Sequence, residues 1–92
     1  MINIATFNAR GIMANIPYLL TMLEMFQIDI IGIQEHWLYP DMLSLLDSIH
    51  NDYASHSVAD KALHPMLRNR NFNRGQGGLA ILYKKSLAPV LS

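Results

Sequence analysis

Apolar and polar residues along the first third of the chain follow spacings typical of regular secondary structure. Residues 2–8 alternate, which predicts a strand with Ile2 and Ile4 on one side and Phe7 on the other. Apolar residues then recur at helical spacing, which predicts a helix over about 16–26 that Asn15 caps. Residues 28–34 carry four isoleucines, which predicts a strand buried on both faces. This order predicts a βαβ unit with parallel strands.

The remaining residues predict further elements of a mixed α/β sheet. A second helix is expected to begin at Tyr39-Pro40-Asp41 and to end near residues 50–51. Strands are predicted over 53–58 and 78–83, with the start of another over 87–91. Residues 60–77 lack periodicity and predict a long exposed loop. The glycines of 75–78 precede a strand, which favours a tight turn into the sheet over a phosphate-binding loop.

Two polar residues follow the first two predicted strands, at the point where each strand ends. Asn8 ends the first strand, and Glu35 comes directly after the second. Because the strands of a βαβ unit are parallel, we expect both side chains at one edge of the sheet, where ligands of α/β proteins gather. Mg²⁺ prefers one or two carboxylates together with water and phosphate oxygens. The pattern therefore predicts a divalent-cation site at Glu35, with Asn8 orienting a phosphate or a metal-bound water.

Other polar residues allow weaker functional interpretations. His36 can donate a hydrogen bond to phosphate, although an exposed loop histidine is the favoured alternative. Arg68, Arg70 and Arg74 surround Phe72 and suit a nucleic-acid backbone, with a solvated loop as an equal alternative. The other histidines lack metal-ligand spacing and no cysteine accompanies them, so a zinc site is not expected.

Composition indicates one small domain or part of a larger one. The 92 residues are 51% hydrophobic, which suggests apolar surface that something outside this sequence covers. Residues 1–60 hold all seven acids and one base, a sum of −6, whereas residues 61–92 hold six bases and no acid, a sum of +6. This segregation suits a metal site beside a phosphate-binding surface, or attraction between two halves of one domain. Without cysteine or an 18-residue apolar run, we expect an intracellular protein, cytoplasmic or nuclear, with no membrane partner and no secretion.

Three motifs in this order resemble the endonuclease/exonuclease/phosphatase superfamily. They are Phe7-Asn8-Ala9-Arg10-Gly11, Ile33-Gln34-Glu35 and Gly77-Gly78-Leu79-Ala80-Ile81-Leu82. The Asn-Ala-Arg-Gly and Gln-Glu-His-Trp-Leu variants are most similar to the endonuclease domain of non-LTR retrotransposons, which nicks target DNA to prime reverse transcription. The resemblance implies metal-assisted phosphodiester hydrolysis with Mg²⁺ or Mn²⁺, with DNA as the partner and RNA as the alternative. It also implies that Glu35 and Asn8 are catalytic, with Glu35 as the metal ligand and Asn8 as a second candidate contact to the metal. Arg10 stands where the family commonly has Asp or Asn.

The resemblance further implies that residues 1–92 form the N-terminal half of a four-layer α/β sandwich of roughly 200–250 residues. The family's Asp-x-Asn and Asp-His motifs then lie beyond residue 92, so we expect no hydrolysis by this chain alone and a tendency to self-associate. The alternatives are a non-catalytic remnant or an interaction module for nucleic acid or protein. Within the superfamily, a repair nuclease, a deadenylase and a phosphatase remain open.

Overall fold

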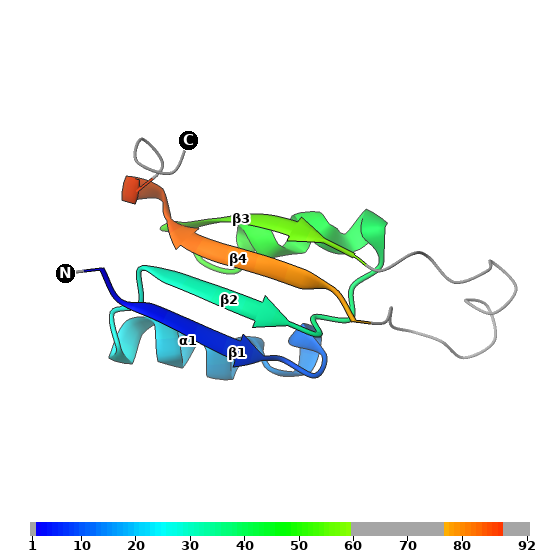
Figure 1. Cartoon of the computed structure of the whole chain (residues 1–92), viewed down its shortest axis with the longest axis horizontal. Helices are drawn as coiled ribbons and strands as arrows, with labels where there is room; N and C mark the ends of the chain where they lie inside the picture. Colours follow the sequence, from blue (N-terminus) through cyan, green and yellow to red (C-terminus); the bar gives the residue numbers. More distant parts are fainter. Residues whose placement is uncertain (1, 60–76, 88–92) are drawn as a thin grey trace, which may run out of the picture.

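A mixed four-stranded sheet in the order β1-β2-β4-β3 forms the centre of the computed structural model, which describes residues 2–59 and 77–87 (Figure 1). The strands are β1 (Ile4–Asn8), β2 (Ile30–Gln34), β3 (Tyr53–Val58) and β4 (Leu79–Lys84). The helical elements are the α-helix α1 (Ile16–Met25) and the 3₁₀ helices η1 (Ile12–Ala14), η2 (Pro40–Ser48) and η3 (Lys85–Leu87). β1 and β2 are parallel, and β4 runs antiparallel to both of its neighbours.

Most elements predicted from the sequence are confirmed. The four strands and the first helix lie within two residues of their expected bounds, and β1 and β2 form the expected parallel pair. The second helix is present in 3₁₀ geometry and ends at Ser48. Leu87 closes η3 where a new strand was expected to begin, and residues 88–91 lie outside the described part of the chain. The loop expected over 60–77 also lies outside it, apart from Gly77.

The turn from α1 to β2 shows how the local sequence fixes the crossover. Gln27 has a φ of 47°, the left-handed conformation common just after a helix end. The Ile28 amide then donates to the Leu23 carbonyl over 3.2 Å, and both side chains lie in the core. This bond satisfies a carbonyl that the helix end leaves free and delivers the chain directly into β2.

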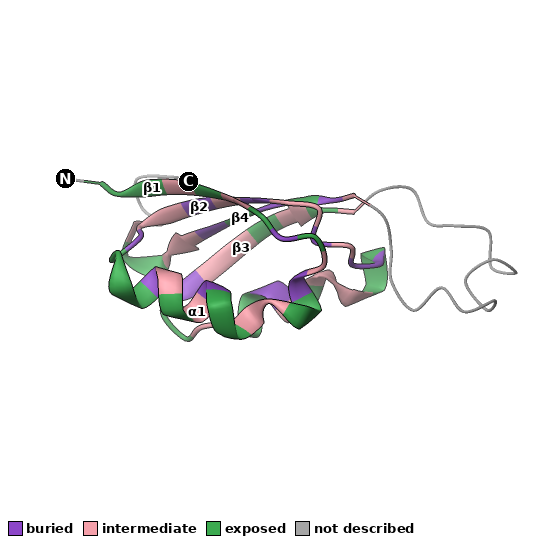
Figure 2. Cartoon of the chain, turned by 90° about the horizontal axis from the view of Figure 1, so that it is seen from below, coloured by how far each residue is buried: buried purple, intermediate pink, exposed green. Residues whose placement is uncertain are grey.

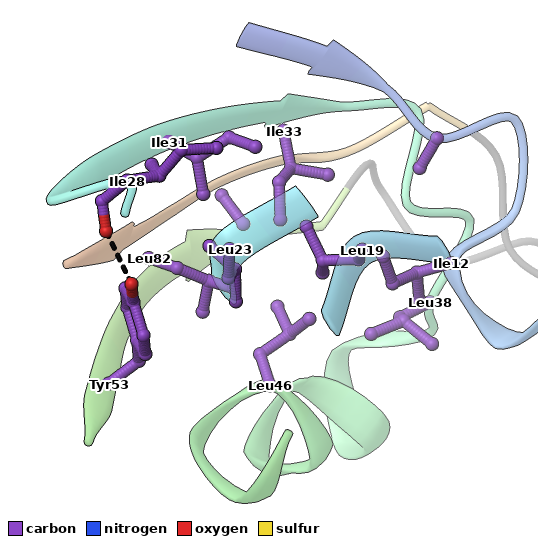
Figure 3. Packing of buried hydrophobic residues seen from close by; sticks show 12 residues of the cluster. Ile12, Leu19, Leu23, Ile28, Ile31, Ile33, Leu38, Leu46, Tyr53 and Leu82 are labelled. Carbon is purple, nitrogen blue, oxygen red and sulfur yellow. Dashed lines mark hydrogen bonds between the residues drawn. The ribbon is translucent and has the colours of Figure 1, made fainter. Parts of the chain in front are cut away.

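The hydrophobic core lies between the sheet and the helices α1, η1 and η2, which cover the same face (Figure 2). Buried side chains of α1, β2, β4 and η2 meet there, namely Leu19, Leu23, Ile31, Ile33, Leu46 and Leu82 (Figure 3). The Tyr53 hydroxyl donates to the Ile28 carbonyl inside this core, and burial raises the pKa of the Tyr53 phenol. No helix of residues 2–59 and 77–87 has the length and apolar character needed to cross a bilayer.

The expectation that β2 is buried on both faces is wrong for the described residues. Ile31 and Ile33 are buried against the helices, but Ile30, Gly32 and Gln34 on the other face are only half-buried. No described element covers that face, so alternate residues of the strand meet solvent (Figure 2). The face is rich in apolar side chains from three strands, with exposed fractions of 70% for Ile4, 62% for Val58, 57% for Leu79 and 47% for Ile81.

Candidate active site

Asn8 and Glu35 meet at the carboxyl ends of two neighbouring parallel strands. β1 pairs with β2 so that Asn8 lies opposite Gln34, one residue before Glu35. The Asn8 Nδ2 atom donates to Glu35 Oε2 over 2.8 Å. The prediction that both residues reach the same edge of the sheet is therefore confirmed. It follows from the crossover through α1, which makes the two strands parallel.

The hydrogen bond also fixes which way the Asn8 amide points. An ionised carboxylate can only accept, so the amide nitrogen must face Glu35 and the Asn8 Oδ1 atom must point away. Asn8 is exposed and Glu35 is half-buried, so solvent reaches the pair. The edge thus presents a held carboxylate and an outward amide oxygen.

Backbone hydrogen bonds hold the segment after β2 from both sides. On one side, the Gly11 and Ile12 amides donate to the carbonyls of Glu35 and His36 over 2.9 and 3.0 Å. On the other side, the Glu35 and Trp37 amides donate to the carbonyls of Gly78 and Gly77 over 2.8 and 3.0 Å. The backbone of Glu35 is therefore fixed between the loop after β1 and the start of β4.

Unusual backbone conformations gather in this segment and in the loop after β1 that is bonded to it. Four described non-glycine residues have a positive φ, and three of them lie here, namely Arg10 (44°), Glu35 (55°) and Trp37 (60°). Such conformations cost on the order of 1 kcal/mol each and persist only where surrounding contacts enforce them. Gly11 has a φ of 94°, and a Cβ at that position would lie 2.6 Å from the Trp37 ring. The strained backbone is concentrated around the candidate site.

Asn15 has a different role from the helix cap predicted by the sequence. Its side chain makes no capping bond to α1. Instead, Asn15 Nδ2 donates to the carbonyls of Ala9 and Gly11 over 2.8 and 3.1 Å. These bonds fold the loop after Asn8 back on itself, which places Arg10 at the rim of the site. The tight turn at Gly11 brings both carbonyls within reach of one side chain, an arrangement that the sequence pattern does not reveal.

His36 is fully buried, so the interpretation as an exposed loop residue is wrong. Its exposed fraction is 0%. Nδ1 accepts a hydrogen bond from the Leu38 amide over 2.9 Å, and Nε2 lies 2.9 Å from the Val58 carbonyl. Because Nδ1 accepts, Nε2 carries the proton and donates to Val58. Both ring nitrogens are occupied, so the predicted hydrogen bond from His36 to phosphate is also wrong in this arrangement.

The glycines before β4 make room for this histidine. A Cβ at Gly78 would lie 2.3 Å from the His36 ring, and Gly78 and Gly77 have φ values of 92° and 54°. The expectation that these glycines provide backbone freedom is confirmed for the described pair. The specific need at Gly78 comes from a residue 42 positions earlier, which a local reading of the sequence does not detect.

The charges at the site favour a cation. Among residues 2–59 and 77–87, no ion pair involves Glu35 or Arg10. The same residues contain no group of three or more His, Cys, Asp or Glu side chains that could hold a metal ion. The Glu35 carboxylate alone can serve Mg²⁺, which keeps several waters and takes few protein ligands. Arg68, Arg70 and Arg74 lie outside the described residues, so their predicted contacts with nucleic acid stay predictions.

Comparison with known proteins places this arrangement in a family. A sequence profile of the endonuclease/exonuclease/phosphatase family matches residues 5–91. The chain belongs to this family. A comparison with curated proteins finds no match. The family match does not distinguish the retroelement subtype, which the motifs alone suggest.

Solved structures of the endonuclease/exonuclease/phosphatase fold are similar to the chain. An AP endonuclease from Archaeoglobus fulgidus has a TM-score of 0.67 at 23% identity, over 90% of this chain and 27% of that one. The 3′ phosphatase NExo from Neisseria, bound to a product DNA hairpin, has a TM-score of 0.62 at 19% identity, over 90% and 27%. The 3′–5′ exonuclease NExo from Neisseria meningitidis has 0.56 at 18%, over 87% and 26%.

The chain thus spans about a quarter of the length of these solved proteins. Its mixed sheet and helices match the N-terminal part of the family fold, which confirms the predicted fold class. Identities below 25% establish the shared fold and leave the substrate open.

Proposed function

We propose that this chain supplies the metal-binding edge of a magnesium-dependent (or manganese-dependent) phosphodiesterase domain. The observation that carries the proposal is the 2.8 Å hydrogen bond between Asn8 Nδ2 and Glu35 Oε2 at the ends of parallel strands. A carboxylate is a ligand that hard cations take, and the Glu35 charge has no cationic partner among the described residues. The family match supports phosphoester chemistry.

In this proposal, each residue has a defined role. Glu35 holds the cation, which when bound polarises the phosphoryl group and stabilises developing negative charge. Asn8 keeps the carboxylate in one orientation, and its outward Oδ1 accepts a hydrogen bond from a water or an ordered group nearby. Arg10, exposed at the rim, provides positive charge for the phosphate backbone on either side of the reacting group.

The proposed substrate is DNA, and the proposed biological role is nicking of target DNA by a non-LTR retroelement endonuclease. The support for that subtype is the motif variants Asn8-Ala9-Arg10-Gly11 and Gln34-Glu35-His36-Trp37-Leu38. The second candidate is a DNA-repair nuclease or phosphatase, because the similar solved proteins carry those activities in their names. Translation of the nucleic acid downstream of Ser92 separates the candidates. If the downstream frame encodes the family's remaining motifs and then a reverse transcriptase, the retroelement endonuclease is supported. If it encodes a complete domain with no reverse transcriptase, the repair nuclease or phosphatase is favoured.

The cation site is tested by titrating the ¹⁵N-labelled chain with Mn²⁺. We expect paramagnetic broadening of the Asn8 side-chain amide and of the Gly11 amide at low Mn²⁺ concentration. Glu35→Gln removes the charged ligand and is expected to abolish this local broadening. Glu24→Gln is the matched control, since it removes the same charge from an exposed side chain near the end of α1, where the chain turns into β2. Equal broadening in Glu35→Gln and in the unaltered chain contradicts the proposal.

We further propose that residues 1–92 alone do not hydrolyse DNA, because the family's later motifs are needed to activate water. The purified chain with Mg²⁺ is expected to leave supercoiled plasmid intact, and nicking that disappears in Glu35→Ala contradicts this.

The open face of the sheet carries exposed Ile4, Val58, Leu79 and Ile81, and we propose that the rest of the domain covers it. Alone, the chain is expected to self-associate, which size measurement over a dilution series tests. A monomer at all concentrations with a cooperative melt contradicts that expectation.

A further inference from the structure

We propose that His36 is a positioning residue for Glu35: its buried ring fixes the strained turn that presents the carboxylate to a cation. The inference rests on the proposed function, since it assigns the residue that supports the proposed metal ligand. Tyrosines apart, His36 is the one polar or charged side chain that is buried among the described residues. It follows the proposed ligand directly in the chain.

The first argument is the set of segments that the ring joins. Nδ1 accepts from the Leu38 amide two residues on, which closes a tight turn over residues 36–38. Nε2 donates to the carbonyl of Val58, the last residue of β3. The ring also packs against Gly78 at the start of β4. One side chain thus connects the turn after β2 with the ends of two further strands.

The second argument is the conformation of Glu35 itself. Its φ of 55° is unfavourable for a residue with a side chain, and Trp37 two positions later has a φ of 60°. His36 is the residue between them. Its two hydrogen bonds and its full burial oppose relaxation of either neighbour into an ordinary extended conformation.

The third argument is that packing alone does not require a histidine here. An aromatic hydrocarbon side chain of similar size would fill the same space. It would leave the Leu38 amide and the Val58 carbonyl without their present partner, and an unsatisfied polar group in a buried place is destabilising. The polar ring therefore provides directional restraint in addition to volume, and residues that orient a metal ligand typically affect metal affinity by about 10–100-fold.

The test compares three variants that remove the restraints separately. His36→Phe keeps the volume and removes both hydrogen bonds. His36→Asn keeps an acceptor near the Nδ1 position, and His36→Gln keeps a donor near the Nε2 position. Mn²⁺ affinity is measured from broadening of the Asn8 side-chain amide, and the free energy of unfolding is measured on the same samples. We expect an affinity loss of at least about tenfold in His36→Phe and a smaller loss in the Asn and Gln variants.

A control separates positioning from general stability. Tyr53→Phe removes a buried hydrogen bond near the start of β2, far along the strand from Glu35. It is expected to lower stability while leaving the Mn²⁺ affinity of the folded chain unchanged. If folded His36→Phe keeps its affinity within twofold, the positioning role is overturned. If His36→Phe does not fold, unchanged affinity in both the Asn and Gln variants overturns it equally.

The outcome for Glu35→Gln keeps the two proposals apart. Loss of Mn²⁺ binding in Glu35→Gln together with normal binding in the His36 variants rejects the positioning role and leaves the proposed function intact. Unchanged binding in Glu35→Gln rejects the metal site, and with it the reason for any positioning.

Discussion

A carboxylate lies at each end of β2, but the two carboxylates have different partners. At the start of the strand, Asp29 accepts from the Asn3 amide over 2.7 Å and lies 3.3 Å from the Lys84 ammonium. The Asn3 amide, followed by Lys84, lowers the pKa of the Asp29 carboxyl. At the other end, Glu35 receives one neutral amide and no cation from the described residues.

The backbone shows the same contrast. The turn into β2 uses a common helix-ending geometry that favours folding, with one left-handed residue, Gln27, in the place where such residues usually occur. The turn out of β2 holds Glu35 and Trp37 in left-handed conformations against Gly11 and Gly78. One end contributes stability, whereas the other stores strain and leaves a charge uncompensated. Active sites commonly show the second combination.

The largest expected effect on stability is at the strained end. Gly78→Ala adds a Cβ that would meet the His36 ring at 2.3 Å, at a φ of 92°. Overpacking and the left-handed backbone together are expected to lower the free energy of unfolding by about 3 kcal/mol. Urea denaturation followed by circular dichroism measures it. Gly32→Ala is the control, because a Cβ added at Gly32 would come no closer than 4.0 Å to a neighbour, the Thr6 Cγ2 atom. Equal losses of stability in the two variants would contradict the tight packing at Gly78.

The next largest effect on stability is expected at the start of β2. Tyr53→Phe removes the hydrogen bond to the Ile28 carbonyl, which lies in the core. The free energy of unfolding is expected to fall by about 1.5 kcal/mol, the cost of an unsatisfied buried acceptor. Thermal and urea denaturation of both proteins provide the measurement. No change in stability would show that this end of the sheet does not depend on the buried hydroxyl.

A smaller and pH-dependent effect is expected at Asp29. Because folding lowers the pKa of this carboxyl below its ordinary value of 3.8, the folded state binds its proton less readily than the unfolded state. The stabilisation is therefore complete above the ordinary value and is lost as the pH falls through the folded pKa. Asp29→Asn should lower stability at neutral pH and flatten its dependence on pH below about 4. If the variant and the unaltered chain lose stability in the same way as the pH falls, the contacts of Asp29 with the Asn3 amide and Lys84 do not stabilise the fold.

The smallest effect is expected from Glu35→Gln, which removes the uncompensated charge. Stability should change by less than about 0.5 kcal/mol, or rise slightly, because no described cation loses its partner. Denaturation at low ionic strength gives the most sensitive measurement. A loss as large as that of Asp29→Asn would mean that Glu35 is a structural residue and would remove the contrast between the two ends.

The amino-acid sequence alone determined the order of elements and the position of the candidate site. Alternation in 2–8, helical spacing after Asn15 and the isoleucines of 28–34 are local signals, because side-chain periodicity depends on the geometry of one element. From these, the βαβ connectivity places Asn8 beside Glu35 without further information. The burial of one face of β2 and the open face opposite could not be predicted, because burial depends on which other layers are present.

Only the tertiary structure decided what supports the site. His36 is buried because the end of β3 and the start of β4 enclose it, and Asn15 bonds the loop after β1 because Gly11 turns that loop back. These partners lie between 4 and 42 residues apart in sequence, and such contacts leave no periodic pattern. Local sequence therefore specifies where a side chain leaves a strand, whereas long-range packing specifies whether it is exposed, held or buried.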